Sequence, residues 1–399
     1  MVKKRIENTA ELQNMVKNLQ KVKTDMSLAV DVKKKKKNNK KRNVSIGSAD
    51  VPENTSGKLS IGIVGVGSIG TTIALMLASK GYDVEITKKS TNALTIDNCV
   101  NLEINGAFGD KSYLVPYVEH NNFSTKKDVL IMCTQSYSTA NALSEVKKYL
   151  KPNGVVISMQ NTLNIDDVLK EIPASQYIAL IIDWTATRIE ENHVIVLREA
   201  EMHIGTFDEK ANKYLPVIKR VLDSIQPTNI QENMMSFIAS RFVLNTTLSS
   251  VLAVTGHRLK HTLLRKEARK LVIGMVGEIL EVFKAYGIDV PPYCDVLDYE
   301  KFTKGGLFGH IYRQKIFTRF IAQNGDLSSS ILRALENKKR TEIDSMSGRV
   351  VSMAKEKGID VPFSETITNF LRDVEAGKES IFMENLQNPC FTNLKIKWR

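Results

Sequence analysis

The spacing of apolar residues along the chain changes once, near residue 230. Before that point, short apolar runs alternate with stretches of helical spacing, which is typical of a parallel sheet covered by helices. After it, segments of period two disappear and longer helical patterns follow. We therefore predict an α/β domain with a mostly parallel, doubly wound sheet over residues 58–229 and an all-α domain over residues 230–399.

Individual elements follow from the same pattern. Two similar segments, residues 285–292 and 356–363, each place a Gly and then a Pro after a helical run, so each should end a helix and turn the chain. The predicted strands are residues 59–64, 84–86, 129–132, 155–157, 178–182, 194–197 and 202–204, and the predicted helices are residues 71–79, 237–254, 266–286, 329–357 and 365–376.

A glycine motif follows the first predicted strand directly. Gly65-Val66-Gly67-Ser68-Ile69-Gly70 is a complete G-x-G-x-x-G between a strand and a helix. In that context the first glycine makes the tight turn, the second lets the backbone approach a pyrophosphate, and the third allows close helix–strand packing. The motif predicts a Rossmann-type dinucleotide site, and the alternative is a glycine-rich turn in an unrelated α/β protein.

Polar residues at the ends of later strands bear on the choice of cofactor. A site for NAD would place an acidic residue at the end of the second strand, where this chain has Thr87-Lys88-Lys89-Ser90. Two ammonium groups there favour a 2′-phosphate and hence NADP, unless they only begin a solvated loop. Residues 133–137 and 158–161 leave two further strands at the edge where ligands bind in open α/β sheets.

Net charge changes this picture little once it is located. The formal charge is +12, but residues 1–42 contain 14 Lys/Arg and 4 Asp/Glu, so the rest of the chain is nearly neutral. We expect residues 1–57 to be a basic, largely disordered extension with a short amphipathic helix, because Leu12, Val16, Leu19, Val22 and Met26 have helical spacing. This extension is either a solvating arm or a weak contact for polyanions.

Cysteines and histidines offer no metal signature in the sequence. The four cysteines lack any C-x-x-C spacing, and His257 and His261 have no third ligand pattern beside them, so we expect idle thiols and surface histidines. No apolar run is long enough to indicate a membrane span, and no secretory signal pattern is present, so the sequence predicts a cytoplasmic protein.

Several motifs occur in the order typical of one enzyme family. Ser329-Ser330-Ile331-Leu332, then Lys339 to Asp344 (KRTEID), then Gly358-Ile359 with Pro362, resemble the serine pair, the T-E-I-D and the G-I-x-x-P of the ketopantoate reductases (2-dehydropantoate 2-reductases). Arg241 and Asn245, with Ser249, are similar to that family's K-x-x-x-N-x-x-x-N helix. The resemblance covers about residues 59–370.

This resemblance implies roles for particular residues. Residues 65–70 (Gly65, Val66, Gly67, Ser68, Ile69 and Gly70) would hold the pyrophosphate, and Lys89 the 2′-phosphate. Asn161 matches an asparagine near the nicotinamide and the substrate. Asn245 and Ser330 would bind the substrate, and Glu342 a hydroxyl of the cofactor or substrate.

The chain departs from the family pattern at four positions. Arg241 stands at the catalytic lysine, Ser249 at the second helix asparagine, Gln135 at a lysine common in the loop after the fourth strand, and Thr162 at the glycine of Q-N-G. The first departure bears on mechanism, because an arginine stays protonated and cannot deliver a proton. Arg241 could still polarise a carbonyl or clamp a carboxylate.

Each of these residues also has an ordinary structural interpretation. Arg241 could be a snorkelling residue, Asn245 a satisfied interhelical amide, Ser330 a helix N-cap and Glu342 a solvated charge. Taken together, the sequence predicts an NADPH-dependent reductase of a 2-keto acid, with ketopantoate leading and a homodimer implied by the resemblance. The alternatives are a related reductase for another keto acid and a non-catalytic NADP-binding sensor or scaffold.

Overall fold

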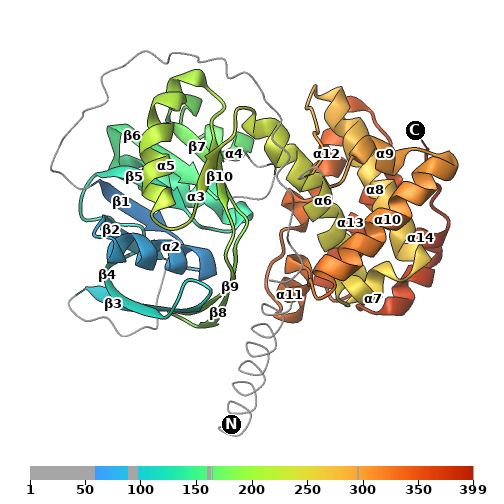
Figure 1. The fold of residues 1–399 in the computed structure, drawn as a ribbon, viewed down its shortest axis with the longest axis horizontal. Helices are drawn as coiled ribbons and strands as arrows, with labels where there is room; N and C mark the ends of the chain where they lie inside the picture. Colours follow the sequence, from blue (N-terminus) through green and yellow to red (C-terminus); the bar gives the residue numbers. More distant parts are fainter. Residues whose placement is uncertain (1–58, 89–97, 160–162, 164, 294–295, 399) are drawn as a thin grey trace, which may run out of the picture. The chain divides into compact units, whose positions relative to one another are not determined.

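A computed structural model of the chain describes residues 59–88, 98–159, 163, 165–293 and 296–398 (Figure 1). These residues fall within one compact unit, Pro52–Arg399. The chain alternates between strands and helices as far as Ile230 and is helical from Met234 onward. The predicted extension, residues 1–57, lies outside the described residues.

The strands form an 11-stranded, mostly parallel sheet in the order β11-β10-β7-β6-β5-β1-β2-β4-β3-β9-β8. Strands β7, β6, β5, β1 and β2 are parallel neighbours, while β10 pairs antiparallel with β7, β3 with β4, and β8 with β9. The strand bounds are β1 Ser60–Val64, β2 Asp83–Lys88, β3 Cys99–Gly106, β4 Lys111–Glu119, β5 Lys127–Met132, β6 Leu150–Ser158, β7 Tyr177–Ile182, β8 Thr185–Glu190, β9 His193–Arg198, β10 Met202–Gly205 and β11 Thr228–Ile230.

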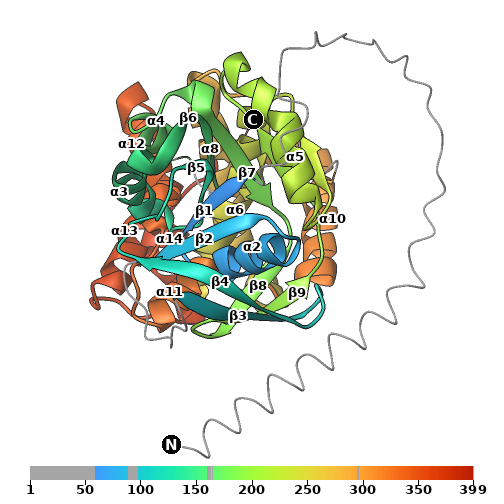
Figure 2. The same ribbon diagram turned by 90° about the vertical axis from the view of Figure 1, so that its left-hand side faces the viewer.

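Alternating side chains of the central strands pack into two separate hydrophobic cores, one on each face of the sheet. In β5, Val129 and Ile131 join one cluster with helix α2 (Ser68–Ser79) and α5 (Leu215–Asp223), whereas Leu130 and Met132 join the other. That second cluster includes α3 (Ser136–Val146) and α4 (Ile165–Leu169) and continues into the helical half. Figure 2 shows the sheet between these two helix pairs, as period two requires of a doubly wound fold.

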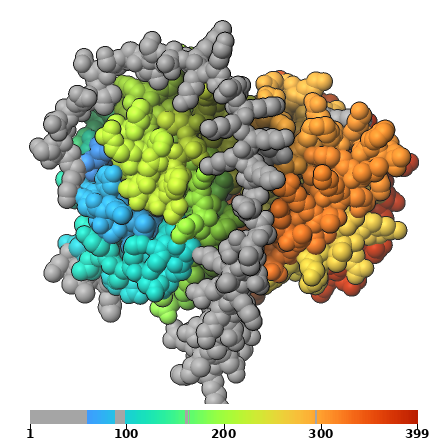
Figure 3. All heavy atoms as spheres, viewed as in Figure 1, coloured from blue at the N-terminus to red at the C-terminus, as the bar shows by residue number. Residues whose placement is uncertain are grey.

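The helical half is built around α6 (Met234–Thr255), which is buried over most of its length. Helix α10 forms part of the surface of this half (orange in Figure 3) and exposes Leu307, Phe308 and Ile311. The other helices are α7 Leu259–Leu263, α8 Lys266–Ala285, α9 Tyr299–Thr303, α10 Gly306–Asn324, α11 Ser330–Glu336, α12 Ser347–Lys357, α13 Pro362–Glu375 and α14 Pro389–Thr392.

One predicted helix is wrong as a single element. The stretch 329–357 divides into α11 and α12, with a 3₁₀ turn at Ile343–Ser345 between them. Lys338, just after α11, has a φ of 51°, which no helix continues through. Of the two Gly–Pro segments, 356–363 turns α12 into α13 through Gly358 at φ 63°; Gly287, at φ 67°, follows the end of α8, but the next helix starts only at Tyr299.

Candidate functional site

The glycine loop leaves the carboxyl end of β1 in the geometry that a dinucleotide site needs. Gly65 has a φ of 93°, which favours glycine, and its N–H donates to the carbonyl of Thr87 at 3.0 Å. A Cβ on Gly70 would lie 2.0 Å from the carbonyl oxygen of Gly65, so only glycine allows α2 to start so close to β1. The first and third glycines are therefore required by the fold itself.

Gly67 is different, because space is open around it. A Cβ placed there would meet no described atom within 4 Å. Gly67 is also the N-cap of α2, and no side chain of the described residues caps this helix end. The first N–H groups of α2, from Ser68 onward, are thus available to an anion, while Val66 is buried beneath the loop. The loop fits a pyrophosphate.

Other strand ends line up beside this loop. The N–H of Cys133, after β5, donates to the carbonyl of Val64 at 2.8 Å, and the N–H of Met159, after β6, donates to Met132 at 3.2 Å. Asp183 follows β7 at the same edge. From β7 to β1 is three strand spacings, or roughly 14 Å, so this edge is long enough for an extended ligand.

Glu342 reaches this edge from the helical half. Its Oε1 accepts hydrogen bonds from Ser136 N at 3.1 Å and from Ser136 Oγ at 2.7 Å, at the start of α3. Ser345 Oγ lies 2.6 Å from the same hydroxyl. Gln135, the N-cap of α3, is exposed and uses no side-chain cap. Glu342 therefore bonds to the residue that follows Gln135, and the interpretation of Glu342 as a merely solvated charge is wrong.

Arg241 is not a free snorkelling side chain. Its Nη1 donates to Asp183 Oδ1 in an ion pair between α6 and the end of β7. The other carboxylate oxygen of Asp183 lies 3.1 Å from His203 Nε2 on β10. Burial would raise the pKa of Asp183, but the hydrogen bond from His203 and the charge of Arg241 outweigh it and hold that pKa below its ordinary value. The carboxylate is therefore ionised beside Arg241 at neutral pH.

One face of α6 continues from Arg241 toward α11. Asn245 is exposed one turn on, and Ser249 Oγ lies 3.5 Å from Asn245 Oδ1 after another turn. Ser329 Oγ donates to the carbonyl of Ser249 at 2.7 Å and accepts from Leu332 N at 3.2 Å. Ser329 is thus the N-cap of α11; the expectation that Ser330 could be the cap is wrong, and Ser330 is the exposed first residue of this helix.

Apart from the glycine loop, the described site residues that were predicted lie in two places: at the start of α3 and along α6. Gln135 and Glu342 lie at the start of α3, and Arg241, Asn245, Ser249 and Ser330 follow α6 to α11. Lys89 and Asn161 lie outside the described residues. Sequence reasoning missed Asp183 and His203, and it named Ser136 only as part of the stretch 133–137; the position of Asp183 directly after a buried strand is a signal that could have singled it out.

Other candidate chemistry is sparse in the part of the chain that the structure describes. No metal-binding cluster of His, Cys, Asp and Glu is found there. His257 and His261 are exposed, which confirms the prediction of surface histidines. Cys133 is a free thiol whose pKa is raised by burial. Among the described helices, only α6 is long and apolar enough to cross a membrane, and 78% of its apolar window is buried, as in the core helix of a globular protein.

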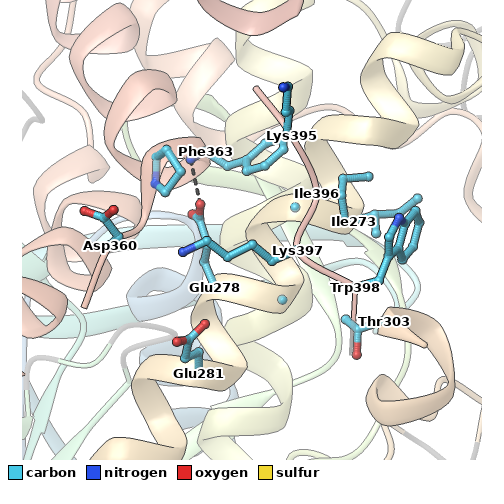
Figure 4. Close-up of a pocket in the computed structure, with 13 residues that line it drawn as sticks. Ile273, Glu278, Glu281, Thr303, Asp360, Phe363, Lys395, Ile396, Lys397 and Trp398 are labelled. Carbon is cyan, nitrogen blue, oxygen red and sulfur yellow. Dashed lines mark hydrogen bonds between the residues drawn. The ribbon is translucent and has the colours of Figure 1, made fainter. Parts of the chain in front are cut away.

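A cavity of about 190 Å³ lies elsewhere, in the helical half (Figure 4). Glu278 of α8 points into it and accepts hydrogen bonds from Phe363 N and Ser364 N at the start of α13, each at 2.7 Å. Lys397 and Trp398 of the C-terminal segment cover it. The predicted site residues are not among those that line this cavity, so we assign it no part in the candidate site.

Comparison with known proteins identifies matches to both halves. Residues 61–209 match the sequence model of the family described as ketopantoate reductase PanE/ApbA, and residues 233–375 match the model of its C-terminal part. A 2-dehydropantoate 2-reductase of Pyrococcus abyssi is 24% identical over 325 residues, covering 80% of this chain and 98% of the relative. One of Archaeoglobus fulgidus is 22% identical over 325 residues, covering 79% and 97%.

Solved structures share the fold. The PanE/ApbA family ketopantoate reductase of Ralstonia eutropha has a TM-score of 0.68 and 20% identity, covering 81% of this chain and all of that one. A D-mandelate dehydrogenase in complex with NADH and anilino(oxo)acetate has a TM-score of 0.69 and 17% identity, covering 80% and 99%. A dimeric ketopantoate reductase of Staphylococcus aureus has a TM-score of 0.63 and 16% identity, covering 80% and all of that chain.

Proposed function

Since this chain belongs to the ketopantoate reductase family and is an oxidoreductase, we propose that it reduces a 2-keto acid with NADPH, with ketopantoate to pantoate as the leading reaction. This reaction would place the protein in pantothenate and coenzyme A biosynthesis. The observation that carries the proposal is that an open glycine loop after β1 lies at the same sheet edge as Asp183, after β7, which holds the cationic side chain of Arg241 from α6.

The cofactor assignment rests on the loop and on the strand beside it. The N–H groups at the start of α2 would hold the pyrophosphate over Gly67, where nothing occupies the space of a side chain. The Lys88-Lys89 pair at the end of β2 would hold the 2′-phosphate. Gln135 and Glu342 would contact ribose or substrate hydroxyls, and Asn161 the nicotinamide end. When bound, NADPH supplies the hydride.

The residues of this chain would bind and polarise the keto acid. The guanidinium of Arg241 faces developing negative charge on the carbonyl oxygen, and its fixed charge stabilises that oxyanion. Because arginine keeps its proton, water delivers the proton to the oxygen. Asn245, Ser249 and Ser330, along one line from Arg241, would bind the substrate hydroxyl and carboxylate.

A second candidate is a related reductase for a different 2-keto acid. Arg241 favours it, because a guanidinium takes a planar carboxylate in a way that a lysine does not. A fold neighbour that is a D-mandelate dehydrogenase with NADH bound is a reason to include aromatic keto acids and NADH in the first assays. If no keto acid is turned over, the remaining alternative is a protein that binds NADP without catalysing a reaction.

The first experiment measures NADPH oxidation with ketopantoate by the natural protein and by Arg241→Lys. We expect turnover by the natural protein, because a fixed cation stabilises the oxyanion without donating its proton. Turnover only in the lysine variant would show that the pocket is intact and that the substrate or the activity has changed. If neither variant turns over although NADPH binds, the ketopantoate assignment is wrong, and a panel of keto acids follows.

The preference for NADP is tested separately with Lys89→Ala. We expect the Kd of NADPH to rise at least about tenfold and that of NADH to stay within about twofold, because one charge-assisted contact to the 2′-phosphate is lost. Lys315→Ala, at an exposed lysine on α10 in the helical half, serves as the matched loss of a cation. Equal weakening of both cofactors by Lys89→Ala would refute the assignment.

Four further expectations remain proposals. We propose a homodimer, in line with the dimeric Staphylococcus aureus relative. We place the protein in the cytoplasm, and we keep a polyanion contact for the basic extension, residues 1–57, as a weaker proposal. The division into domains at residue 229 is likewise proposed; the described chain loses its last strand at Ile230 and starts α6 at Met234.

A further inference from the structure

Arg241 is the last member of a row of hydrogen-bonded side chains that starts at Gln231, directly after β11. Gln231 Nε2 lies 2.9 Å from His203 Nδ1, and His203 Nε2 lies 3.1 Å from Asp183 Oδ2. Asp183 Oδ1 then accepts from Arg241 Nη1. The row joins the segment after β11 to β10, to the end of β7 and finally to α6. None of its first three members was predicted as a site residue.

The chemistry of the donors fixes the direction of this row. The amide nitrogen of Gln231 can only donate, so His203 Nδ1 accepts, and the ring proton lies on Nε2. His203 Nε2 therefore donates to Asp183, and both ring nitrogens have a hydrogen-bond partner. His203 is 8% exposed, and its ring centroid lies 4.6 Å from that of Phe237 on α6. These contacts hold the imidazole in one orientation.

The backbone of Asp183 is fixed as well. Its N–H donates to the carbonyl of Glu201 at 3.0 Å, and its carbonyl accepts from Arg198 Nη2 at 2.8 Å. His203 contacts Oδ2, and Oδ1 accepts the hydrogen bond from Arg241 on α6. Asp183 takes one of the five N–H groups of the Arg241 guanidinium, which leaves donors for a carbonyl oxygen or a carboxylate. The arrangement aims the cation and leaves part of it available.

We propose that Asp183, oriented by His203, is a positioning residue that fixes the guanidinium of Arg241 against the substrate carbonyl. The carboxylate thereby suits position 241 to a residue that keeps its positive charge and not to one that donates a proton. This inference rests on the proposed function. A carboxylate this close to position 241 would also tighten the hold of a lysine on its proton, which would make a lysine there a poor acid. Arginine at this position and aspartate at the end of β7 thus act together as one functional unit.

Steady-state kinetics with matched variants test the positioning. Asp183→Asn keeps the shape and removes the charge; we expect kcat to fall about 10- to 100-fold while the Kd of NADPH stays within about twofold. The control is Asp166→Asn, which removes another ion pair between the sheet half and the helical half, Asp166 to Arg349 at 2.7 Å. It should leave kcat within about twofold. An unchanged kcat in Asp183→Asn, or an equal loss in the control, overturns the proposal.

A pH profile separates charge from scaffolding. In the Arg241→Lys background, the alkaline limb of kcat reports the lysine proton. Adding Asp183→Asn to that background should move this limb to lower pH by about one unit, because the neighbouring negative charge is gone. A carboxylate that only supports the fold would leave the limb in place, and that result contradicts the proposal.

A readout without substrate keeps the two proposals apart. In the natural protein, NMR signals of the Arg241 guanidinium, assigned by their loss in Arg241→Lys, should be resolved and slow to exchange. Asp183→Asn and His203→Asn should average or broaden them, and Asp166→Asn should not. If Asp183→Asn leaves these signals unchanged, the proposal that Asp183 positions Arg241 is wrong. If the signals respond as expected but no 2-keto acid is reduced, the proposed function fails instead.

Discussion

Among single residues, the three glycines of the loop after β1 meet different physical demands. Gly65 needs its positive φ, and Gly70 needs the absence of a Cβ beside the carbonyl of Gly65. Gly67 needs neither, because the space that its side chain would occupy is open. We therefore propose that Gly67 serves cofactor binding, and we expect that replacing it leaves the fold intact.

This difference predicts the behaviour of two alanine variants. Gly67→Ala should keep the Tm of the natural protein within about 2 °C but weaken NADPH binding at least tenfold, since the methyl group occupies the approach of the pyrophosphate. Gly70→Ala should lower the Tm itself, by several degrees, through a contact of 2.0 Å with backbone. Thermal unfolding and fluorescence titration measure both. Unchanged NADPH binding in Gly67→Ala would argue against the loop as the pyrophosphate site.

Glu278 is the buried residue whose protonation should affect stability. Burial raises its pKa from 4.5 to about 7, against the hydrogen bonds from Phe363 and Ser364 and the charge of Lys397, which lower it. Because the pKa in the folded state is the higher one, the stabilisation is complete below pH 4.5 and is lost as the pH rises through 7.

We therefore expect the free energy of unfolding, relative to that of Glu278→Gln, to decline between pH 5 and pH 8 by about 1–3 kcal/mol. Urea denaturation of both proteins at several pH values measures it. The variant will be less stable overall, because its amide nitrogen faces two N–H donors, so the slope with pH is the diagnostic quantity. Parallel curves for the two proteins would show that Glu278 does not titrate in this range.

At the scale of secondary-structure elements, the serine pair Ser329 and Ser330 shows what determines where a helix begins. Ser329 is 1% exposed and both caps α11 and binds the carbonyl of Ser249, whereas Ser330 is exposed. Neighbouring serines in one motif thus have different tasks. The sequence shows the pair, and the backbone conformation at the start of α11 decides which member is the cap.

Alanine substitutions should separate these tasks. Ser329→Ala should lower the free energy of unfolding by about 1–3 kcal/mol, through the lost cap and an unpaired carbonyl. Ser330→Ala should change it by less than about 0.5 kcal/mol but raise the KM for the keto acid if Ser330 binds its carboxylate. Denaturant titration and steady-state kinetics measure the two effects. Equal stability losses would mean that both serines are structural.

On the scale of the whole molecule, the described residues behave as one packed unit. The core cluster on the α3 and α4 side of the sheet continues through α6 to Phe391 near the C-terminus. Polar contacts also connect the sheet half to the helical half: Asp183 with Arg241, Asp166 with Arg349, and Ser136 with both Glu342 and Ser345. Neither half can unfold without exposing part of this core.

Calorimetry of the full chain should therefore show one cooperative transition in spite of the two architectures. NADPH at 100 times its Kd should raise the free energy of unfolding of that whole transition by about 2.7 kcal/mol. Two separated transitions, of which NADPH shifts only one, would show that the halves unfold independently and that the shared core contributes little.

Periodic patterns in the sequence account for much of this fold. Strands β1, β5, β6 and β7 and helices α6, α8 and α13 follow from apolar runs and helical spacing. Strand β8 is largely exposed and lacks an apolar signal, and α10 exposes several of its apolar residues, so neither was predicted. The helix expected over 329–357 failed because Lys338 adopts a conformation with positive φ, which no pattern indicates.

The sequence by itself thus determined the order of the architectures, the glycine loop and the cation at position 241, because each is a local or periodic feature of the chain. Only the tertiary structure decided the partners. Arg241 meets Asp183 from 58 residues away, and Glu342 meets Ser136 from 206. Such pairs depend on which strands lie side by side and where a helix starts, and the spacing of residues along the chain carries no record of either.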